Sequence, residues 1–228
     1  MYSFLPSECK PSMNGPGDRD RFAIVGTTGS GKTYAGMYNL SHRNYDVKPW
    51  IIYDFKNDEL INEIPGAQHI SLTEKLPTRP GVYIVHPVPG EEELVDEHMM
   101  QIWAQENTGV YIDEGYMIPK NSRGFTSILT QGRSKHIPVI TLSQRPVYMN
   151  RFVFTEAQYL QIFRLQHADD IATTQKFIPH DLSGRLPMYH SYWYDVANDK
   201  LVAVGPVPDS DAILDTFDTR MPRMRKVI

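Results

Sequence analysis

The segment Gly26-Thr27-Thr28-Gly29-Ser30-Gly31-Lys32-Thr33 decides the fold of this 228-residue chain. It matches the pattern G-x-x-x-x-G-K-[ST], which is the phosphate-binding loop, or P-loop. The apolar run of residues 21–25 precedes it and predicts a buried strand, and Lys32 to about Leu40 has the pattern of a helix. A strand, a glycine-rich turn and a helix in this order are the context that the motif requires.

Each residue of the loop has a chemical reason to be there. The glycines let the backbone wrap closely, so that successive N–H groups and the helix N-terminus of residues 26–33 face phosphate oxygens. Lys32 is predicted to reach the β- and γ-phosphates of a nucleotide, and the hydroxyl of Thr33 to bind Mg²⁺. The sequence therefore predicts a Mg-ATP site.

A second acidic motif lies downstream, where the apolar run of residues 109–112 ends in Asp113-Glu114. Such an ending is common in strands, but the P-loop upstream favours a functional role for this acidic pair. Asp113 is predicted to hold Mg²⁺ through water. Glu114 is predicted to polarise the attacking water as a general base, which favours hydrolysis over phosphoryl transfer.

Apolar runs alternate with helical patterns along the rest of the chain, which predicts an α/β fold with a mostly parallel sheet covered on both faces. Ligands of such sheets bind beyond the carboxyl ends of the strands, where the acidic pair and the P-loop fall. Near the end, residues 189–195 and 200–204 flank Ala197-Asn198-Asp199 and predict a β-hairpin. We expect an N-terminal arm over residues 1–20, one ATPase domain over 21–217 and a basic tail over 218–228.

Composition limits the class of protein. A hydrophobic content of 41%, a charged content of 22% and a net charge of −4 are those of an ordinary globular protein. The single cysteine, Cys9, excludes an intramolecular disulfide, and the spacing of the eight histidines predicts no structural metal site. No apolar run approaches the roughly 20 residues that span a bilayer, and the N-terminus has no signal-peptide pattern. We therefore expect a soluble intracellular protein.

Three further segments carry a family resemblance. Thr141-Leu142-Ser143-Gln144-Arg145-Pro146 resembles the T-x-x-Q-R-P motif of the FtsK–HerA superfamily of DNA-pumping ATPases. The segment of residues 130–134 resembles that family's G-R segment, and Ile52-Tyr53-Asp54-Phe55-Lys56 is similar to its strand followed by Asp-x-Lys. The resemblance covers about residues 21–180.

The resemblance implies a RecA-like P-loop NTPase core with an additional strand and a catalytic glutamate, assembled into a ring, usually a hexamer, around DNA. Carried over to this chain, Gln144 would sense the γ-phosphate or the water. Arg133 would reach the neighbouring subunit's ATP site as an arginine finger. Arg145 is a rival for that role and Arg123 a weaker one. Asp54 and Lys56 have a simpler alternative, a surface pair with each other.

The short arms around a bare core most resemble the genome-packaging ATPases of membrane-containing icosahedral, tectivirus-like phages and viruses. The predicted function is ATP-driven translocation of double-stranded DNA into a preformed capsid. The predicted location is the host cytoplasm or the virion vertex, with a capsid-vertex or viral-membrane protein as partner. Two alternatives remain: an assembly or export factor of the Zot type that acts on protein or membrane, and a small-molecule kinase.

A translocating ring holds DNA mainly through phosphates, because it has to accept any sequence. The candidate contacts are basic: Lys120, Arg123, Lys135, His136, and the tail residues Arg220, Arg223, Arg225 and Lys226. A solvated loop and a solubilising tail are the alternatives for these residues. The aromatic cluster Tyr189, Tyr192, Trp193 and Tyr194 is expected to pack the hairpin, since aromatic residues are good strand formers.

Overall fold

Nine strands form one sheet in the order β3-β4-β2-β5-β6-β1-β7-β8-β9. The computed structural model of the protein describes residues 16–221. Strands β1 to β7 are parallel where they pair, and β8 and β9 join antiparallel. This confirms the predicted α/β class, the mostly parallel sheet and the hairpin. The strands are β1 (Arg21–Val25), β2 (Pro49–Asp54), β3 (Gln68–His69), β4 (Gly81–Val85), β5 (Gly109–Asp113), β6 (Val139–Ser143), β7 (Tyr159–Phe163), β8 (Ser191–Asp195) and β9 (Lys200–Val204).

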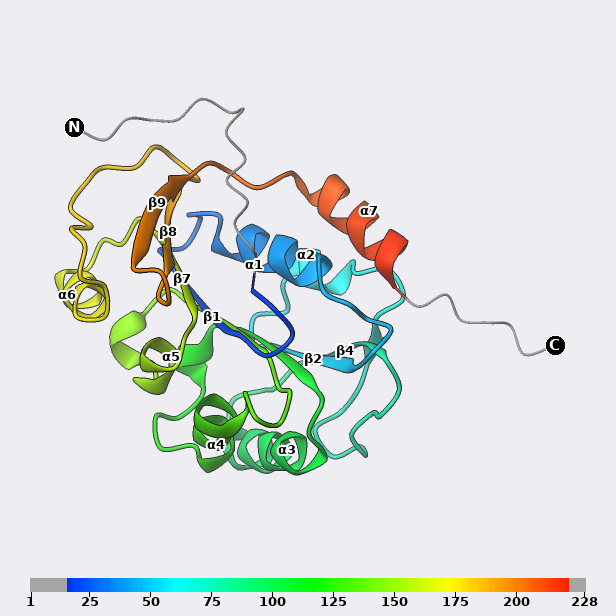
Figure 1. Ribbon diagram of the computed structural model, residues 1–228. Coiled ribbons are helices and arrows are strands. Elements are labelled where there is room, and N and C mark those ends of the chain that lie inside the picture. The colour runs from blue at the N-terminus through cyan, green and yellow to red at the C-terminus, as the bar shows by residue number, and fades with distance from the viewer. Residues whose placement is uncertain (1–15, 222–228) are drawn as a thin grey trace.

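Helices cover both faces of this sheet (Figure 1). Helices α1, α2 and α7 lie on one face, and α3, α4, α5 and α6 lie on the other. The helices are α1 (Lys32–Ser41), α2 (Glu59–Asn62), α3 (Glu92–Gln105), α4 (Arg123–Gln131), α5 (Phe152–Thr155), α6 (Ala168–Gln175) and α7 (Ser210–Arg220), with 3-10 turns η1 (Gly115–Met117) and η2 (Pro146–Tyr148).

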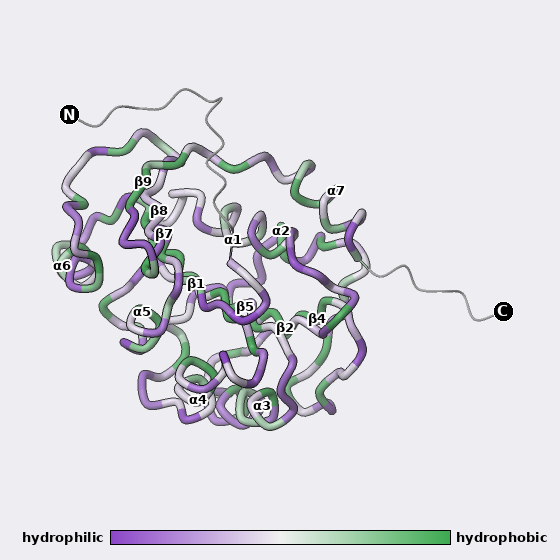
Figure 2. The backbone as a smooth tube through the Cα atoms, viewed as in Figure 1, coloured by the Kyte–Doolittle hydropathy of each residue, from purple (hydrophilic) through white to green (hydrophobic). Residues whose placement is uncertain are grey.

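Two hydrophobic cores result, one on each face of the sheet, because successive strand residues point to opposite faces. Strands β1, β2, β4, β5 and β6 are buried along their whole length, as expected for strands covered on both sides. Figure 2 shows hydrophobic residues gathered in the sheet and hydrophilic ones along many of the outer loops. The aromatic residues of β8 follow the same rule, since Tyr192 and Tyr194 pack into one core and Trp193 into the other.

Strand register brings the predicted site together. Residues Val25 and Ser143, which end β1 and β6, are opposite each other. Asp54 at the end of β2 is opposite Asp113 at the end of β5. The P-loop, both aspartates and the segment that follows Ser143 therefore share the carboxyl edge of the sheet.

Helix α7 was not predicted from the sequence, although Asp209 caps it by accepting a hydrogen bond from the backbone of Ala212. Its buried Ile213 and Phe217 are four residues apart, which is a helical spacing that could have revealed it. Helix α7 continues past the boundary expected after residue 217, so Arg220 belongs to this helix.

Of the N-terminal arm expected over residues 1–20, the structure describes residues 16–20. The described residues 16–20 dock on the domain, because Arg43 donates a hydrogen bond to the backbone of Pro16 and Val139 N donates to Asp20 O. Cys9, Arg223, Arg225 and Lys226 lie outside the described residues. Over residues 16–221, no helix is both long enough and apolar enough to cross a membrane.

Candidate active site

The P-loop is held between the ends of two strands. Gly26 N donates to Ser143 O at 3.1 Å, and Thr27 N donates to Arg164 O at 3.0 Å. Gly31 has a φ of 96°, a left-handed conformation that favours glycine, and it turns the chain into α1. Gly36 lets α1 approach the sheet, since a β-carbon there would lie 2.6 Å from the Tyr111 hydroxyl. The N–H groups of the first turn of α1 therefore face the carboxyl edge.

Lys32 and Glu114 form an ion pair at the centre of this edge. Their Nζ and Oε1 atoms are 3.1 Å apart, and the side chains are 6% and 0% exposed. Two charges removed from water so completely need further partners to offset the desolvation cost. Glu114 has them, because Lys56 Nζ also contacts Oε1, and Gln144 N donates to Oε2 at 3.0 Å.

Glu114 has a left-handed backbone, with φ 63° and ψ 60°. A non-glycine residue in this region costs about 1–3 kcal/mol, and such strain clusters at functional sites. The strained turn is followed by η1, where Met117 N donates to Glu114 O at 2.9 Å. The turn aims the carboxylate of Glu114 at the P-loop lysine, and the role of Glu114 as a general base stays a prediction.

Gln144 connects the P-loop, the glutamate and the turn that follows β5. Its side-chain oxygen accepts a hydrogen bond from the Thr28 hydroxyl, and its Nε2 donates to the Tyr116 hydroxyl at 3.1 Å. Its backbone N–H donates to Glu114, as described above. A residue with these three contacts is placed to respond to a phosphate in the loop, which suits the sensor role that the resemblance implied.

Asp113 fits a cation ligand. It is 1% exposed, and its Oδ1 has no hydrogen-bond partner among the described residues. Burial, and then the neighbouring charge of Glu114, raise the pKa of Asp113 to about 7, whereas Lys32 and Lys56 act in the opposite direction. An unpaired buried carboxylate oxygen is costly unless something binds it, and hard divalent cations prefer oxygen ligands. Thr33, half-buried at the start of α1, supplies the hydroxyl that a P-loop offers to Mg²⁺.

The alternative that Asp54 and Lys56 pair with each other at the surface is wrong. Lys56 Nζ contacts Glu114 instead, while Asp54 is buried and organises its own loop. The Asp54 carboxylate accepts backbone hydrogen bonds from Lys56 at 3.1 Å and Asp58 at 2.9 Å, and His86 Nδ1 lies 3.4 Å from it. Burial raises the pKa of Asp54, and these backbone bonds oppose the rise. Asp54 therefore positions Lys56, and Lys56 belongs to the site.

The three candidate arginines have different surroundings. Arg145 Nε lies 3.0 Å from Oδ2 of the buried Asp170, and its guanidinium lies over the Tyr148 ring at 4.7 Å. Arg133 is exposed in the turn that precedes β6, at the amino edge of the sheet, away from its own P-loop. Arg123 is exposed at the start of α4. Which of them acts as a finger stays a prediction.

Asp170 is a site residue that sequence reasoning missed. Its second oxygen accepts a hydrogen bond from Val147 N at 3.0 Å, so one carboxylate fixes both Arg145 and η2 just after Gln144. In the sequence, Asp169-Asp170 has the pattern of acidic residues that favour a helix start. No local signal shows that Asp170 turns inward, because its partners lie 23 and 25 residues away.

No family model matches the sequence. The DNA packaging ATPase P9 of Enterobacteria phage PRD1 is 43% identical over 214 residues, which cover 89% of this chain and 94% of that protein. The chain belongs to the family of this packaging ATPase. The likeness includes nearly the whole of both chains.

Solved structures agree with the packaging-ATPase family on the fold. The genome packaging NTPase B204 from Sulfolobus turreted icosahedral virus 2, in complex with AMPPCP, matches with a TM-score of 0.65 at 19% identity. The match covers 84% of this chain and 100% of that one. EssC (ATPases 2 and 3) from Geobacillus thermodenitrificans matches with a TM-score of 0.62 at 12% identity, over 89% of this chain and 44% of that one.

Proposed function

We propose that this chain hydrolyses ATP to move double-stranded DNA into a preformed viral capsid. The observation that carries the proposal is the buried ion pair of Lys32 and Glu114, with Gln144 bonded to Glu114, on the P-loop edge of a chain 43% identical to a DNA packaging ATPase. The side chains of this site can carry out hydrolysis, and the similarity to a DNA packaging ATPase suggests that hydrolysis is coupled to DNA movement.

The reaction uses contacts that already exist in the site. The phosphates of ATP enter the P-loop, and Lys32 exchanges its contact with Glu114 for the β- and γ-phosphates. Glu114 then accepts a proton from a water molecule as that oxygen attacks the γ-phosphorus. The bond to the β–γ bridging oxygen breaks, and ADP leaves with that oxygen. Gln144, bonded to Glu114 and to Thr28, registers whether the γ-phosphate is present.

Thr33 and Asp113 would hold Mg²⁺, which supplies charge neutralisation at the β- and γ-phosphates when it is bound. The orphaned Oδ1 of Asp113 supports this assignment. When Lys32 turns to the phosphates, the ammonium group of Lys56 stays in contact with the Glu114 carboxylate and holds it in place.

We assign the subunits to a closed ring, a hexamer by resemblance, in which Arg133 acts on the neighbouring site. In a head-to-tail ring, different surfaces of two subunits meet, so an exposed residue remote from its own P-loop can reach the next one. Exposure of Arg133 at the amino edge supports this role, whereas Arg145 is already engaged by Asp170 beside its own Gln144. A capsid-vertex or viral-membrane protein is the proposed partner, with the host cytoplasm or virion vertex as the place of action.

DNA contact is proposed for the basic–aromatic patch, which consists of Lys120, Arg145 and Tyr148. Lys120 donates to Val147 O at 2.8 Å and lies 6.0 Å from the Tyr148 ring, which is 52% exposed. The patch joins the loops that follow Glu114 and Gln144, so its position depends on both catalytic strands. Lys135 is a weaker candidate, because it is engaged by Glu106 and Trp103.

The test is steady-state ATP hydrolysis with and without double-stranded DNA, for the wild type and Glu114→Gln, with particle mass measured in parallel. We expect DNA to stimulate the wild type and Glu114→Gln to lose hydrolysis by about a hundredfold or more while it still binds Mg-ATP. Hydrolysis that ignores DNA, from a protein that stays monomeric at every concentration, would contradict the proposal. Stimulation by a partner protein alone would favour an assembly or export factor instead.

A further inference from the structure

Polar side chains continue along the carboxyl edge of the sheet on the side away from the P-loop. Strands β3, β4, β2 and β5 are neighbours in that order, and β3 is the outermost. His69 ends β3, His86 directly follows β4, Asp54 ends β2, and Glu114 directly follows β5. Asp54 and His86 are level with each other, because each follows a residue of the last register pair between β2 and β4. Four adjacent strand ends therefore form a line from the outermost strand to Glu114.

His86 lies within this line and contacts a neighbour on each side. Its Nδ1 lies 3.3 Å from the backbone oxygen of Asp54 and 3.4 Å from Oδ2 of the same residue. A backbone oxygen can only accept, so Nδ1 carries a proton. Its Nε2 lies 3.2 Å from Nδ1 of His69, and the two rings stack 22° from parallel with their centroids 5.3 Å apart. His69 therefore fixes the plane of the His86 ring, and the Nδ1 proton stays aimed at Asp54.

Asp54 shapes the turn that carries Lys56. Its two carboxylate oxygens accept the backbone N–H groups of Lys56 and Asp58, one each. Between these two residues, Asn57 has a left-handed backbone with a φ of 55°, a conformation that asparagine tolerates better than most residues. One buried carboxylate thus holds both ends of the turn, and a rotation of that carboxylate would release both N–H groups.

Lys56 extends from this turn to Glu114. Its Nζ contacts Oε1 of Glu114, although 39% of the Lys56 side chain is exposed. Holding a lysine that is this exposed costs side-chain entropy, so the contact depends on where the turn places the lysine backbone. The Glu114 carboxylate is fully buried, and its position depends in the same way on the partners that reach it.

We infer that His86 is a positioning residue for ATP hydrolysis. It fixes Asp54, Asp54 fixes the turn, and the turn places Lys56 against Glu114. The inference rests on the proposed function, since it assumes that Glu114 is the general base. A misplaced Lys56 lets the carboxylate move relative to the attacking water, and an error of about 1 Å in a reacting group can cost about a hundredfold in rate.

The test compares two substitutions at His86. His86→Leu removes the Nδ1 donor, whereas in His86→Asn the side-chain amide offers an N–H in its place. His180→Leu is the matched control: the His180 side chain is 35% exposed against 31% for His86, and it also lies beside an aspartate, Asp199, but at the turn between β8 and β9. For each variant, kcat is measured at saturating Mg-ATP and the affinity for Mg-ATP is measured by calorimetry.

We expect His86→Leu to lower kcat by about tenfold or more and to leave the affinity for Mg-ATP unchanged, because the P-loop stays intact. His86→Asn is expected to recover most of the loss, and His180→Leu to change neither quantity. A fall of kcat and affinity together in His86→Leu would show that His86 merely supports the fold, and would overturn the inference.

A double-mutant cycle shows whether the effect passes through Lys56. Lys56→Met removes the ammonium group and is expected to lower kcat at least as far, so adding His86→Leu to it should cause no further loss. An unchanged kcat in His86→Leu, no recovery in His86→Asn, the same loss in His180→Leu, or a full further loss beside Lys56→Met would overturn the inference and leave the proposed function standing. A wild type that binds Mg-ATP without hydrolysing it would refute the proposed function itself.

Discussion

Asp113 and Glu114 are adjacent carboxylates that the fold removes from water for different purposes. Glu114 has two lysines and a backbone N–H to offset its burial, whereas Asp113 has an oxygen without a partner among the described residues. Because a buried carboxylate without a partner is costly, Asp113 destabilises the folded protein when no metal is bound. The cost should therefore be visible in stability as well as in activity.

The first prediction concerns Asp113→Asn. The folded protein raises the pKa of Asp113 from 3.8 to about 7, so it binds this proton more tightly than the unfolded chain does. The charged form then costs stability most above about pH 7, and the cost fades as the pH falls toward about 4. We expect Asp113→Asn to raise the free energy of unfolding by on the order of 1–4 kcal/mol at about pH 8, and by less at about pH 5. Urea denaturation in the presence of a chelator measures this.

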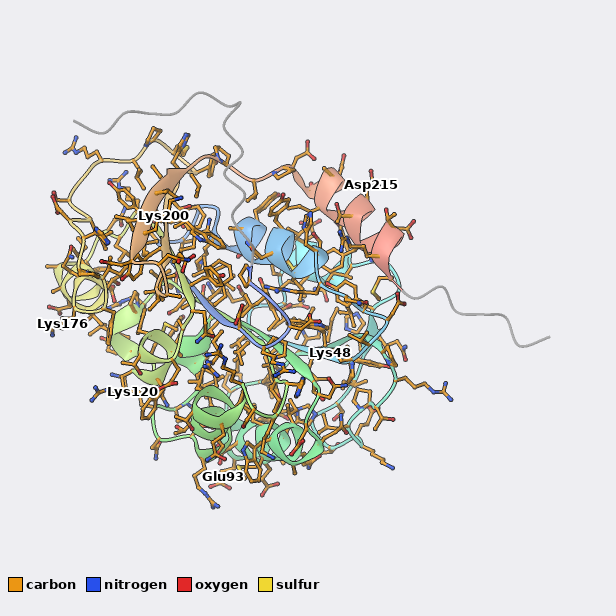
Figure 3. All side chains as sticks on the ribbon, in the orientation of Figure 1. Lys48, Glu93, Lys120, Lys176, Lys200 and Asp215 are labelled. Atoms are coloured by element: carbon orange, nitrogen blue, oxygen red, sulfur yellow. The ribbon has the colours of Figure 1, made fainter. Side chains whose placement is uncertain are left out.

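The same substitution is expected to abolish the stabilisation that Mg-ATP gives to the wild type, because the proposed Mg²⁺ ligand is lost. The control is Asp215→Asn, since Asp215 is exposed on α7 and labelled in Figure 3. A variant of Asp113 that is less stable than the wild type at about pH 8 would show that Asp113 has a favourable partner and that this account of it is incorrect.

The sequence predicts those residues of the site that a local pattern marks. It does not predict those whose contacts are distant in the sequence. The P-loop residues and Glu114 lie at strand ends that local patterns reveal. The contact of Lys56 with Glu114 spans 58 residues, and the strained backbone of Glu114 leaves no mark in the sequence. Only the packing of β2 beside β5 brings Lys56 to its partner.

At the level of elements, the loops after β5 and β6 act together. Asn150 donates side-chain hydrogen bonds to Lys120 O at 3.1 Å and to the Thr126 hydroxyl at 2.9 Å, so the segment after η2 is tied to the loop before α4. Each loop begins at a residue that contacts the other, since Gln144 N bonds Glu114. A shift at Glu114 or at Gln144 is therefore expected to reach the basic–aromatic patch.

The second prediction tests that patch with Lys120→Glu. Lys120 lies at the periphery of the molecule in Figure 3 and is exposed, so a DNA phosphate could reach its ammonium group. The slope of log affinity against log salt concentration becomes less steep by about 0.9 when one phosphate contact is lost. We expect Lys120→Glu to weaken DNA binding and to reduce the stimulation of hydrolysis, while hydrolysis without DNA stays near the wild type. DNA binding is measured at several salt concentrations.

Lys200→Glu provides the matched control, because Lys200 is exposed on β9, away from the patch, and the substitution changes the charge by the same amount. Equal losses in both variants would mean that DNA responds to the overall charge of the protein, and the patch would lose its assignment.

The sequence predicts the helices and strands that have a repeated residue pattern. It does not predict features that depend on contacts between distant residues. The apolar strands with helices between them were recognised, since each is apolar throughout. Helix α6 was expected, but the inward turn of its Asp170 was not. The sequence predicts that Tyr189 packs the hairpin with the other aromatic residues. In the structure it lies before β8 and is 49% exposed, and its ring packs on the P-loop rather than in a core.

Residues with proposed roles lie at both edges of the sheet. The carboxyl edge of the sheet carries the P-loop, Glu114 and Gln144, and the amino edge carries Arg133 in the turn before β6. A five-residue strand separates the edges by roughly 15 Å, so Arg133 cannot serve its own P-loop in this fold. If Arg133 takes part in hydrolysis, a second subunit has to receive it. The sequence suggested this role by resemblance only, because no pattern in one chain describes the packing of two.

The third prediction separates Arg133 from Arg145 by mixing variants. Arg133→Ala keeps an intact P-loop and should lose about a thousandfold or more of the hydrolysis rate, the effect of removing an arginine finger. Lys32→Ala is inactive but retains Arg133. If Arg133 acts on the neighbouring site, mixed rings of the two contain some intact sites, and hydrolysis returns on mixing. Arg145, held by Asp170 beside its own Gln144, should behave oppositely: Arg145→Ala mixed with Lys32→Ala is expected to stay inactive. Recovery in the Arg145 mixture but not in the Arg133 mixture would transfer the finger to Arg145, and with it the face of the subunit that meets the next ATP site.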